Sequence, residues 1–216
     1  MFVYPTAYQK QKRISYITNS TSSANLTNYS LTIGSAISAG TIIISIHAGT
    51  TGIGARTCNT MTLAGQSCTF IARINDSNSD TELWYLKLPT ALAVNSTLAI
   101  NMSSNCESMA AIIYRAQGVL STPKFSATTK LSISSTLNFG TIDNLGTGNL
   151  IVGFSYYNGG STTGTWNYPT ENVETGYDAG AKGLTAASAR TTTASQNVTV
   201  TYTIATLLLG VVAIVR

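Results

Sequence analysis

Short hydrophobic runs alternate with polar, turn-forming segments along the chain, and no helical period is sustained. Residues 13–18 (RISYIT) and 28–33 (NYSLTI) alternate apolar and polar positions, as expected for strands with one buried face. Residues 41–47 (TIIISIH) form a near-continuous apolar run, which predicts a central strand. Further strands are predicted at 58–63, 67–74, 82–88, 94–102, 108–115, 131–139, 149–157, 184–190, 196–204 and 206–215. The pattern predicts an all-β, antiparallel β-sandwich.

The two halves of the chain are weakly alike. The segment from Gly40 to Ile46 resembles the segment from Gly148 to Phe154, which aligns Ile42 with Leu150. The strand pair 94–102 and 108–115 likewise resembles the pair 196–204 and 206–215, which aligns Leu98 with Val198. This similarity predicts a weak internal duplication.

The duplication permits two similar sheets in one sandwich or two small sandwiches in tandem. The connection at 116–130 is short and has no Pro/Gly-rich linker, which favours one sandwich. We therefore predict an N-terminal arm at 1–13 and a β-sandwich at 14–216, with similar halves at 14–118 and 130–216.

Composition changes the expectation about the surface. Of the 216 residues, 44% are hydrophobic, enough for a full core, but only 9% are charged. An average globular domain carries roughly 25% charged residues. A polar but nearly uncharged surface suits a protein that lies against copies of itself or a larger assembly.

The net charge is +4, yet most basic residues are scattered singly along the sequence. Only Lys10, Lys12 and Arg13 cluster, in the N-terminal arm. They are the predicted partner-binding residues, with a solvated arm as the alternative. Nucleic-acid binding is not predicted, because it normally needs basic residues clustered on one face.

Targeting signals and cysteines add little. The N-terminus lacks the apolar segment of a secretory signal, and the apolar run Ile204 to Val215 is too short to span a membrane. The cysteines, Cys58, Cys68 and Cys106, have no metal-site spacing and are expected as free thiols, buried in the case of the last two.

Candidate catalytic residues are few. The single histidine, His47, ends an apolar strand without a nucleophile motif, so a structural role is expected. Glu171 and Glu174 are expected in a loop at 164–178 with Trp166, Tyr168 and Tyr177. Those aromatics could stack on a sugar, which keeps carbohydrate binding open, whereas an edge loop without a ligand is the alternative.

Metal and nucleotide sites are also weakly indicated. Asp76 to Asp80 (DSNSD) has the oxygen spacing of a calcium loop but lacks its glycine and closing acidic residue, and a plain Asn/Ser-rich turn explains it as well. No glycine-rich phosphate loop opens a helix. We predict no enzymatic activity, no cofactor and no metal.

Four segments resemble a family of virion proteins of tailed bacteriophages. They are SAGTIIISIHAGTTG, SMAAIIYRAQG, TGNLIVGFSYYNGG and SARTTTASQNVTVTY. The shared pattern is a glycine-led apolar strand, a Gly/Thr loop, and a strand pair ending in an aromatic-Arg-x-x-Gly corner, here Tyr114, Arg115 and Gly118.

The resemblance implies a jelly-roll-like sandwich without enzyme activity on the surface of a phage particle assembled in the bacterial cytoplasm. Because the chain has a short basic arm ahead of a compact sandwich, a capsid decoration (cement) protein is expected. Its partners would be the major capsid protein and copies of itself, as a homotrimer. A receptor- or carbohydrate-binding module of a tail fibre or baseplate, which binds a host surface glycan, is the alternative.

Overall fold

The computed structural model describes residues 12–50, 54, 56–120, 123–143, 148–158, 163–177 and 182–216. Its described elements are all β-strands, and the paired strands run antiparallel. The first half contains β1 (Arg13–Ser22), β2 (Leu26–Ile33), β3 (Gly40–Gly49), β4 (Cys58–Leu63), β5 (Gln66–Ser67), β6 (Thr69–Asn75), β7 (Ser79–Leu88), β8 (Ser96–Cys106) and β9 (Ser108–Gln117). The second half contains β10 (Phe125–Ile142), β11 (Leu150–Asn158), β12 (Gly164–Trp166), β13 (Thr170–Tyr177), β14 (Lys182–Arg190) and β15 (Gln196–Val215).

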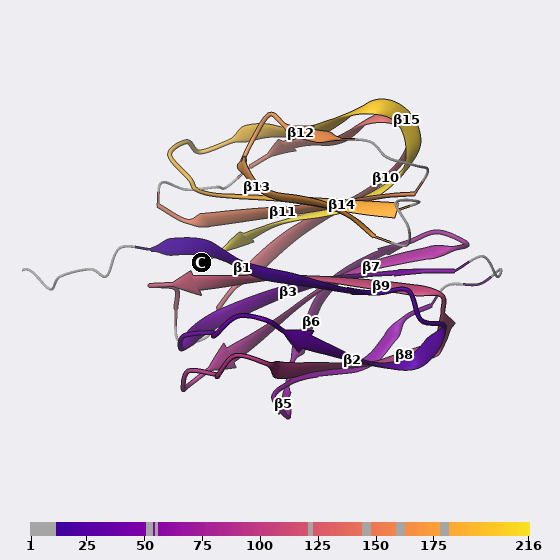
Figure 1. The fold of residues 1–216 in the computed structure, drawn as a ribbon. Helices are drawn as coiled ribbons and strands as arrows, with labels where there is room; N and C mark the ends of the chain where they lie inside the picture. Colours follow the sequence, from indigo (N-terminus) through magenta and orange to yellow (C-terminus); the bar gives the residue numbers. More distant parts are fainter. Residues whose placement is uncertain are drawn as a thin grey trace, which may run out of the picture.

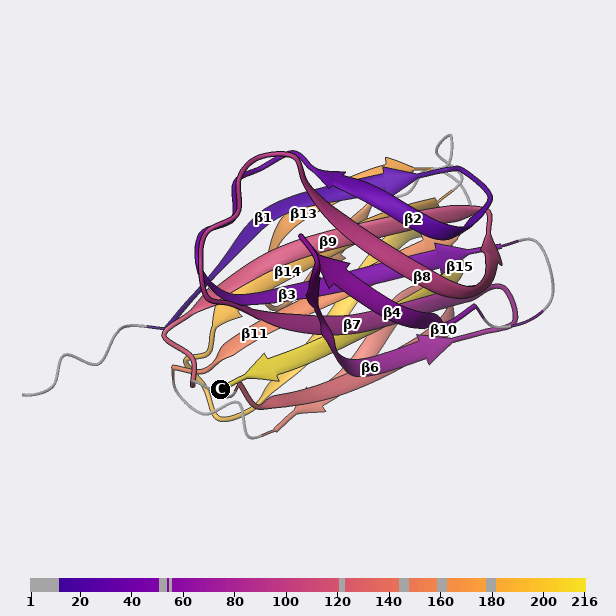
Figure 2. The same ribbon diagram turned by 90° about the horizontal axis from the view of Figure 1, so that it is seen from below.

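The first half forms two facing sheets. The larger sheet has the strand order β1-β9-β3-β7-β6, and the smaller has the order β2-β8-β4-β5. Figure 2 looks onto the smaller sheet, which lies over the larger one. Apolar side chains from both sheets, including Tyr29, Ile44 and Trp84, form the core between them.

The second half repeats this arrangement with two long strands. Its main sheet has the order β10-β15-β11-β14-β13, and β12 pairs with β15 off this path. The β10–β15 ladder breaks between Ser134 and Thr136, so 136–142 of β10 and 196–201 of β15 form a separate part of the ladder with β12. Figure 1 shows both strands curling over at this point. Leu137, Val200 and neighbouring side chains form a core under the curled part.

Strand for strand, the two halves have the same order. The outer part of β10, the outer part of β15 and β12 stand where β2, β8 and β4 stand in the first half. The remaining parts of β10 and β15 correspond to β1 and β9. The predicted fold class, an all-β antiparallel jelly-roll-like sandwich with internal duplication, is therefore confirmed.

The larger sheets of the two halves pack against each other. Ile43 and Tyr114 from the first half and Phe154 and Val211 from the second belong to one buried cluster between them. In Figure 1 the halves therefore appear as stacked pairs of layers. Strand β3 is covered on both faces, so it is buried at nearly every position, which agrees with its prediction as a central strand.

The segment 164–178 differs from the prediction. It was expected to be a loop, but it contains β12 and the edge strand β13. Thr and Glu interrupt its apolar positions because β13 has one exposed face, and a bulge between Glu171 and Val173 shifts the alternation. The three cysteines are free; Cys58 and Cys106 are buried, and Cys68 is partly exposed.

Candidate interaction site at the basic end

The fold brings together basic residues that lie far apart in the sequence. Lys12 and Arg13 stand at the start of β1, Arg115 is near the end of β9, and Arg190 ends β14. The strand registers place Arg13 opposite Gln117 and Arg190 opposite Leu150, so these positions share one end of the stacked sheets. We call this end of the molecule the basic end.

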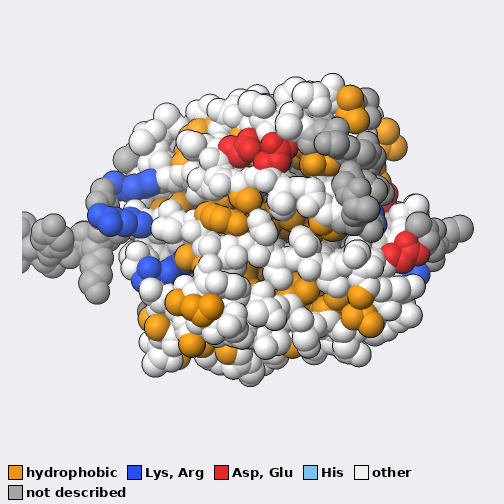
Figure 3. All heavy atoms as spheres, in the orientation of Figure 1, with side chains coloured by type: hydrophobic (Ala, Val, Ile, Leu, Met, Phe, Trp, Pro, Cys, Tyr) orange, Lys and Arg blue, Asp and Glu red, His pale blue; other side chains and the backbone are white. Residues whose placement is uncertain are grey.

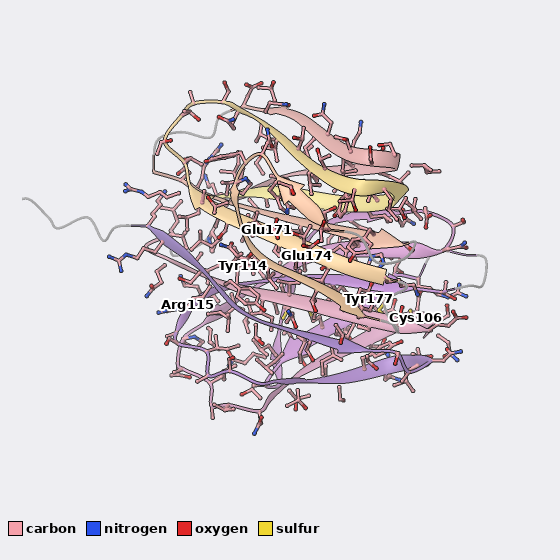
Figure 4. All side chains as sticks on the ribbon, turned by 45° about the horizontal axis from the view of Figure 1, so that its top comes forward. Cys106, Tyr114, Arg115, Glu171, Glu174 and Tyr177 are labelled. Atoms are coloured by element: carbon pink, nitrogen blue, oxygen red, sulfur yellow. The ribbon has the colours of Figure 1, made fainter. Side chains whose placement is uncertain are left out.

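The figures show how the charged side chains are distributed over the molecule. In Figure 3 most of the blue side chains on the visible face gather at one end, an acidic pair lies apart from them, and a second acidic patch lies at the opposite end beside a small area of blue. In Figure 4 Arg115 lies toward the end at which β1 begins, whereas Tyr177 and Cys106 lie toward the opposite end. Of the predicted binding residues, Lys12 and Arg13 are therefore placed at the basic end, and Lys10 lies outside the described residues.

A surface groove opens at the basic end, where β1 of the first half runs beside β13 and β14 of the second. Its volume is about 350 Å³. The groove is lined by Lys12, Arg13, Ile14, Ser15, Asn172, Ser188, Ala189 and Arg190. These lining residues include cations, hydroxyls and an amide but no carboxylate.

Two contacts hold basic side chains in place. Lys12 Nζ donates a hydrogen bond of 2.8 Å to Asn149 Oδ1, which links the arm to the second half. Arg115 Nε donates to the Ala39 carbonyl oxygen at 2.9 Å. Across the described residues, the ion pairs join Arg73 to buried carboxylates at the far end of the molecule, so Arg13 and Arg190 have no acidic partner there.

A β-bulge directs Asn172 toward the groove. Glu171 pairs with Ala187 and Val173 with Ala186, so Asn172 is the extra residue on β13. Its Oδ1 accepts hydrogen bonds from the Ser188 hydroxyl at 2.6 Å and from the Tyr114 hydroxyl at 2.9 Å. These bonds fix the amide with its oxygen occupied, which leaves the Nδ2 group as a donor.

Trp166 and Tyr177 do not form the sugar-stacking surface that the sequence left open. Trp166 is 7% exposed and donates from Nε1 to Thr185 Oγ1 at 3.0 Å inside the second half. Tyr177 is 6% exposed and meets the His47 ring edge-on. The prediction of an exposed aromatic loop was wrong, because two of its three aromatics belong to cores instead of the surface.

The acidic pair of this segment is also differently placed. Glu171 and Glu174 lie on strand β13, and the Glu174 side chain accepts a hydrogen bond from the Gly164 amide at 2.5 Å. Burial, together with the charge of Glu174, raises the pKa of Glu171. Glu174 therefore ties β13 to β12, and the pair does not face an exposed aromatic surface formed by Trp166 and Tyr177.

His47 is enclosed between the two halves. It is fully buried, its Nδ1 lies 2.9 Å from Thr81 Oγ1, and its ring stacks on Tyr156 at 4.7 Å. Burial and the nearby Lys182 lower the pKa of His47 to about 3. Lys182 Nζ donates to Ser108 Oγ at 2.7 Å, and that hydroxyl is also fully buried. A substrate cannot reach these groups in this arrangement, which fits a role in joining the halves.

The calcium-like string is used within the protein. Asp76 Oδ1 accepts hydrogen bonds from the amides of Asn78 and Ser79, at 2.8 and 2.6 Å, which caps the turn. Asp80 is only 1% exposed and lies on the core side of β7 with Glu82. Among the residues that the structure describes, no three His, Cys, Asp or Glu side chains are grouped to hold a metal ion.

The cluster of Asp80, Glu82 and Arg73 was not predicted from the sequence. Glu82 Oε1 accepts from Arg73 and from the Cys58 amide, and its Oε2 accepts from Trp84 Nε1, all at 2.7 to 2.8 Å. Burial and Glu82 raise the pKa of Asp80 to about 9. The sequence does contain a sign of this cluster: Asp80 and Glu82 are two positions apart, which in a strand places both carboxylates on one face.

Comparison with known proteins gives no relative. No family model, no curated protein and no solved structure matches this chain. In the described part of the chain, no helix is long and apolar enough to cross a membrane. The candidate interaction site therefore rests on the geometry of the basic end alone.

Proposed function

We propose that this chain is a non-enzymatic structural protein that attaches to a larger particle through its basic end. The resemblance stated for the sequence suggests which particle: the head of a tailed phage, where the chain would serve as a capsid decoration protein. Its partners would then be the major capsid protein and further copies of the chain. The observation that carries the proposal is the gathering of Lys12, Arg13, Arg115 and Arg190 at one end without acidic partners for Arg13 and Arg190 in the described structure.

The distribution of charge over the rest of the surface supports the same function. The strands of the first half's outer sheet, β2, β4, β5 and β8, contain no charged residue. The corresponding outer layer of the second half, formed by 136–142, 164–166 and 196–204, contains none either. Exposed positions on these layers are mainly Thr, Asn and Ser, so neighbouring copies can approach without like-charge repulsion.

The competing tail-module function rests on glycan binding by the 164–178 segment. The burial of Trp166 and Tyr177 removes the aromatic surface on which a sugar would stack. The geometry therefore favours attachment through the basic end over glycan recognition.

Deletion of residues 2–13 tests the proposal. Full-length and truncated protein would be mixed with purified expanded capsids and sedimented, and the bound chain would be quantified. We expect the truncation to abolish binding because it removes the arm, Lys12 and Arg13. Full occupancy by the truncated protein would contradict attachment through this end.

A matched pair of point variants controls for net charge. Arg13→Ala removes one positive charge at the basic end, and Lys130→Ala removes one from an exposed position on β10, at the opposite edge of the second half's main sheet. We expect only Arg13→Ala to reduce capsid binding, and we expect the wild-type binding to weaken as salt is added.

A further inference from the structure

The groove at the basic end has the composition of a site for one small anionic group. Lys12, Arg13 and Arg190 contribute positive charge, and Asn172 contributes an amide whose oxygen is already occupied. The guanidinium of Arg190 packs beside Gly148, with Nη2 3.1 Å from where a Cβ would stand at that glycine. A side chain at residue 148 would therefore displace Arg190 from this position.

The lining of the groove also favours binding of a carboxylate side chain over other anions. Ile14 and Ala189 line it together with the cations, so they can contact the methylene groups of an acidic side chain. Arginine forms paired, in-plane hydrogen bonds with a carboxylate. The volume of about 350 Å³ is near the lower limit of ligand sites, and it suits one or two side chains better than a polymer backbone.

Nucleic acid fits this groove less well. Binding of a single strand normally combines a long basic track with exposed aromatic rings for base stacking. The described residues lining the groove include no aromatic side chain. A protein segment rich in Asp and Glu is therefore the partner that the chemistry favours.

We propose that the groove between β1 and β14 is a carboxylate-binding site, which takes an Asp or Glu side chain from an acidic segment of the docking partner. Arg13 and Arg190 hold the carboxylate from the two halves of the molecule, Lys12 adds a third charge, and Asn172 Nδ2 donates to it. The assignment rests on the proposed docking function, since it names what the basic end binds.

The test uses the full chain and a defined probe, without capsids. Binding of the fluorescein-labelled peptide acetyl-Glu-Asp-Glu-Asp-amide is measured by anisotropy, and the site is located from amide shifts in an isotope-labelled sample. We expect saturable binding with shifts at Ser15, Asn172 and Ala189. The uncharged peptide acetyl-Gln-Asn-Gln-Asn-amide should not bind.

Three variants define the role of the arginines. Arg190→Ala should weaken peptide binding about tenfold, because the loss of one hydrogen bond to a charged group lowers an affinity by about this factor or more. Arg190→Lys keeps the charge but loses the planar fork, so it should also weaken binding. Lys130→Ala, the charge-matched control, should bind like the wild type.

The outcomes separate this inference from the proposed function. The inference is overturned if the peptide does not bind, if its binding is unchanged in Arg190→Ala, or if Arg190→Lys binds like the wild type, which would mean simple charge attraction. Tighter binding of a thymidine octamer than of the acidic peptide would also overturn it. Peptide binding without capsid attachment would support the carboxylate-binding site and refute the particle role. Capsid attachment without peptide binding would support the particle role and refute the carboxylate-binding site.

Discussion

Replacing Asp80 with asparagine tests the buried charge cluster of the first half. Arg73 Nε and Nη2 lie 2.8 and 2.7 Å from Glu82 Oε1. The distance from Arg73 Nε to Asp80 Oδ2 is 3.6 Å, which is beyond hydrogen-bonding distance. Arg73 therefore compensates the charge of Glu82, and Asp80 is the carboxyl group that keeps its proton. Burial and the adjacent Glu82 raise the pKa of Asp80 from its ordinary 3.8 to about 9.

The pH dependence of stability follows from this raised pKa. A group with a raised pKa in the folded state stabilises the protein fully below the ordinary value of 3.8, and this contribution is lost as the pH rises toward about 9. Holding the proton at neutral pH costs at most about 4 kcal/mol, from roughly 1.4 kcal/mol per pH unit above the ordinary pKa. In Asp80→Asn, the amide that replaces the carboxyl group would leave buried donors unpaired, at about 1–3 kcal/mol. We expect a net stabilisation of about 2 kcal/mol at neutral pH, from the difference between these two costs.

Urea unfolding, followed by tryptophan fluorescence between about pH 4 and pH 9, measures this effect. Asp80→Asn should be less stable than the wild type at the acidic limit and more stable at the alkaline limit. Asp143→Asn, at an exposed carboxylate, is the control and should follow the wild type. If the curves of Asp80→Asn and wild type are parallel over this range, Asp80 is ionised in the folded protein and the reasoning is refuted.

Three further predictions concern the packing of the second half, the groove and the buried histidine. Gly210→Ala would place a Cβ 2.6 to 2.9 Å from two core side chains and a backbone oxygen, so it should lower the free energy of unfolding by about 1–3 kcal/mol, whereas Gly34→Ala, with nothing within 4 Å, should not. Asn172→Ala removes the acceptor of two buried hydroxyls and should cost about 1–3 kcal/mol in urea unfolding, with weaker binding of the acidic peptide. The His47 ring signals should not titrate by NMR from neutral pH down to about pH 4, because the pKa is lowered to about 3. Since the unfolded state takes up a proton on this ring below about 6.5 and the folded state does not, His47 lowers stability as the pH falls through that value.

The strands of the first half were largely predictable because alternation and apolar runs report directly on burial. The turn between β6 and β7 was expected from its Asn, Asp and Ser residues, and the structure places it after Asn75. Strands β12 and β13 were missed because one has only three residues and the other carries a bulge, so neither shows a clean period of two.

The duplication was predicted, but its first alignment was displaced. Ile42 was matched with Leu150, yet Ile42 faces the core inside its own half and Leu150 faces the core shared by the halves. A shift by one residue exchanges the two faces of a strand, and apolar residues on both faces of β3 and β11 hide such a shift. The second match, Leu98 with Val198, places both residues in the core of their own half.

Lys12 and Arg13 of the basic end were predictable from their clustering in the sequence, but their grouping with Arg115 and Arg190 was not. About a hundred residues separate Arg13 from Arg115, and several tens separate Arg115 from Arg190. Only the pairing of strands from both halves places them together. The burial of Trp166 was unpredictable for the same reason, since its covering partners come from β10 and β15. Contacts between distant segments decide both features, and a local pattern contains no information about them.

The proposed function would make the chain a structural component of a phage head. Its most direct test is the copy number of the chain in purified tailed-phage particles, determined by quantitative mass spectrometry against the major capsid protein. The account predicts a copy number of the same order as that of the capsid protein, lost when residues 2–13 are deleted. Absence of the chain from the particles, or only the few copies expected of a tail fibre, would contradict it.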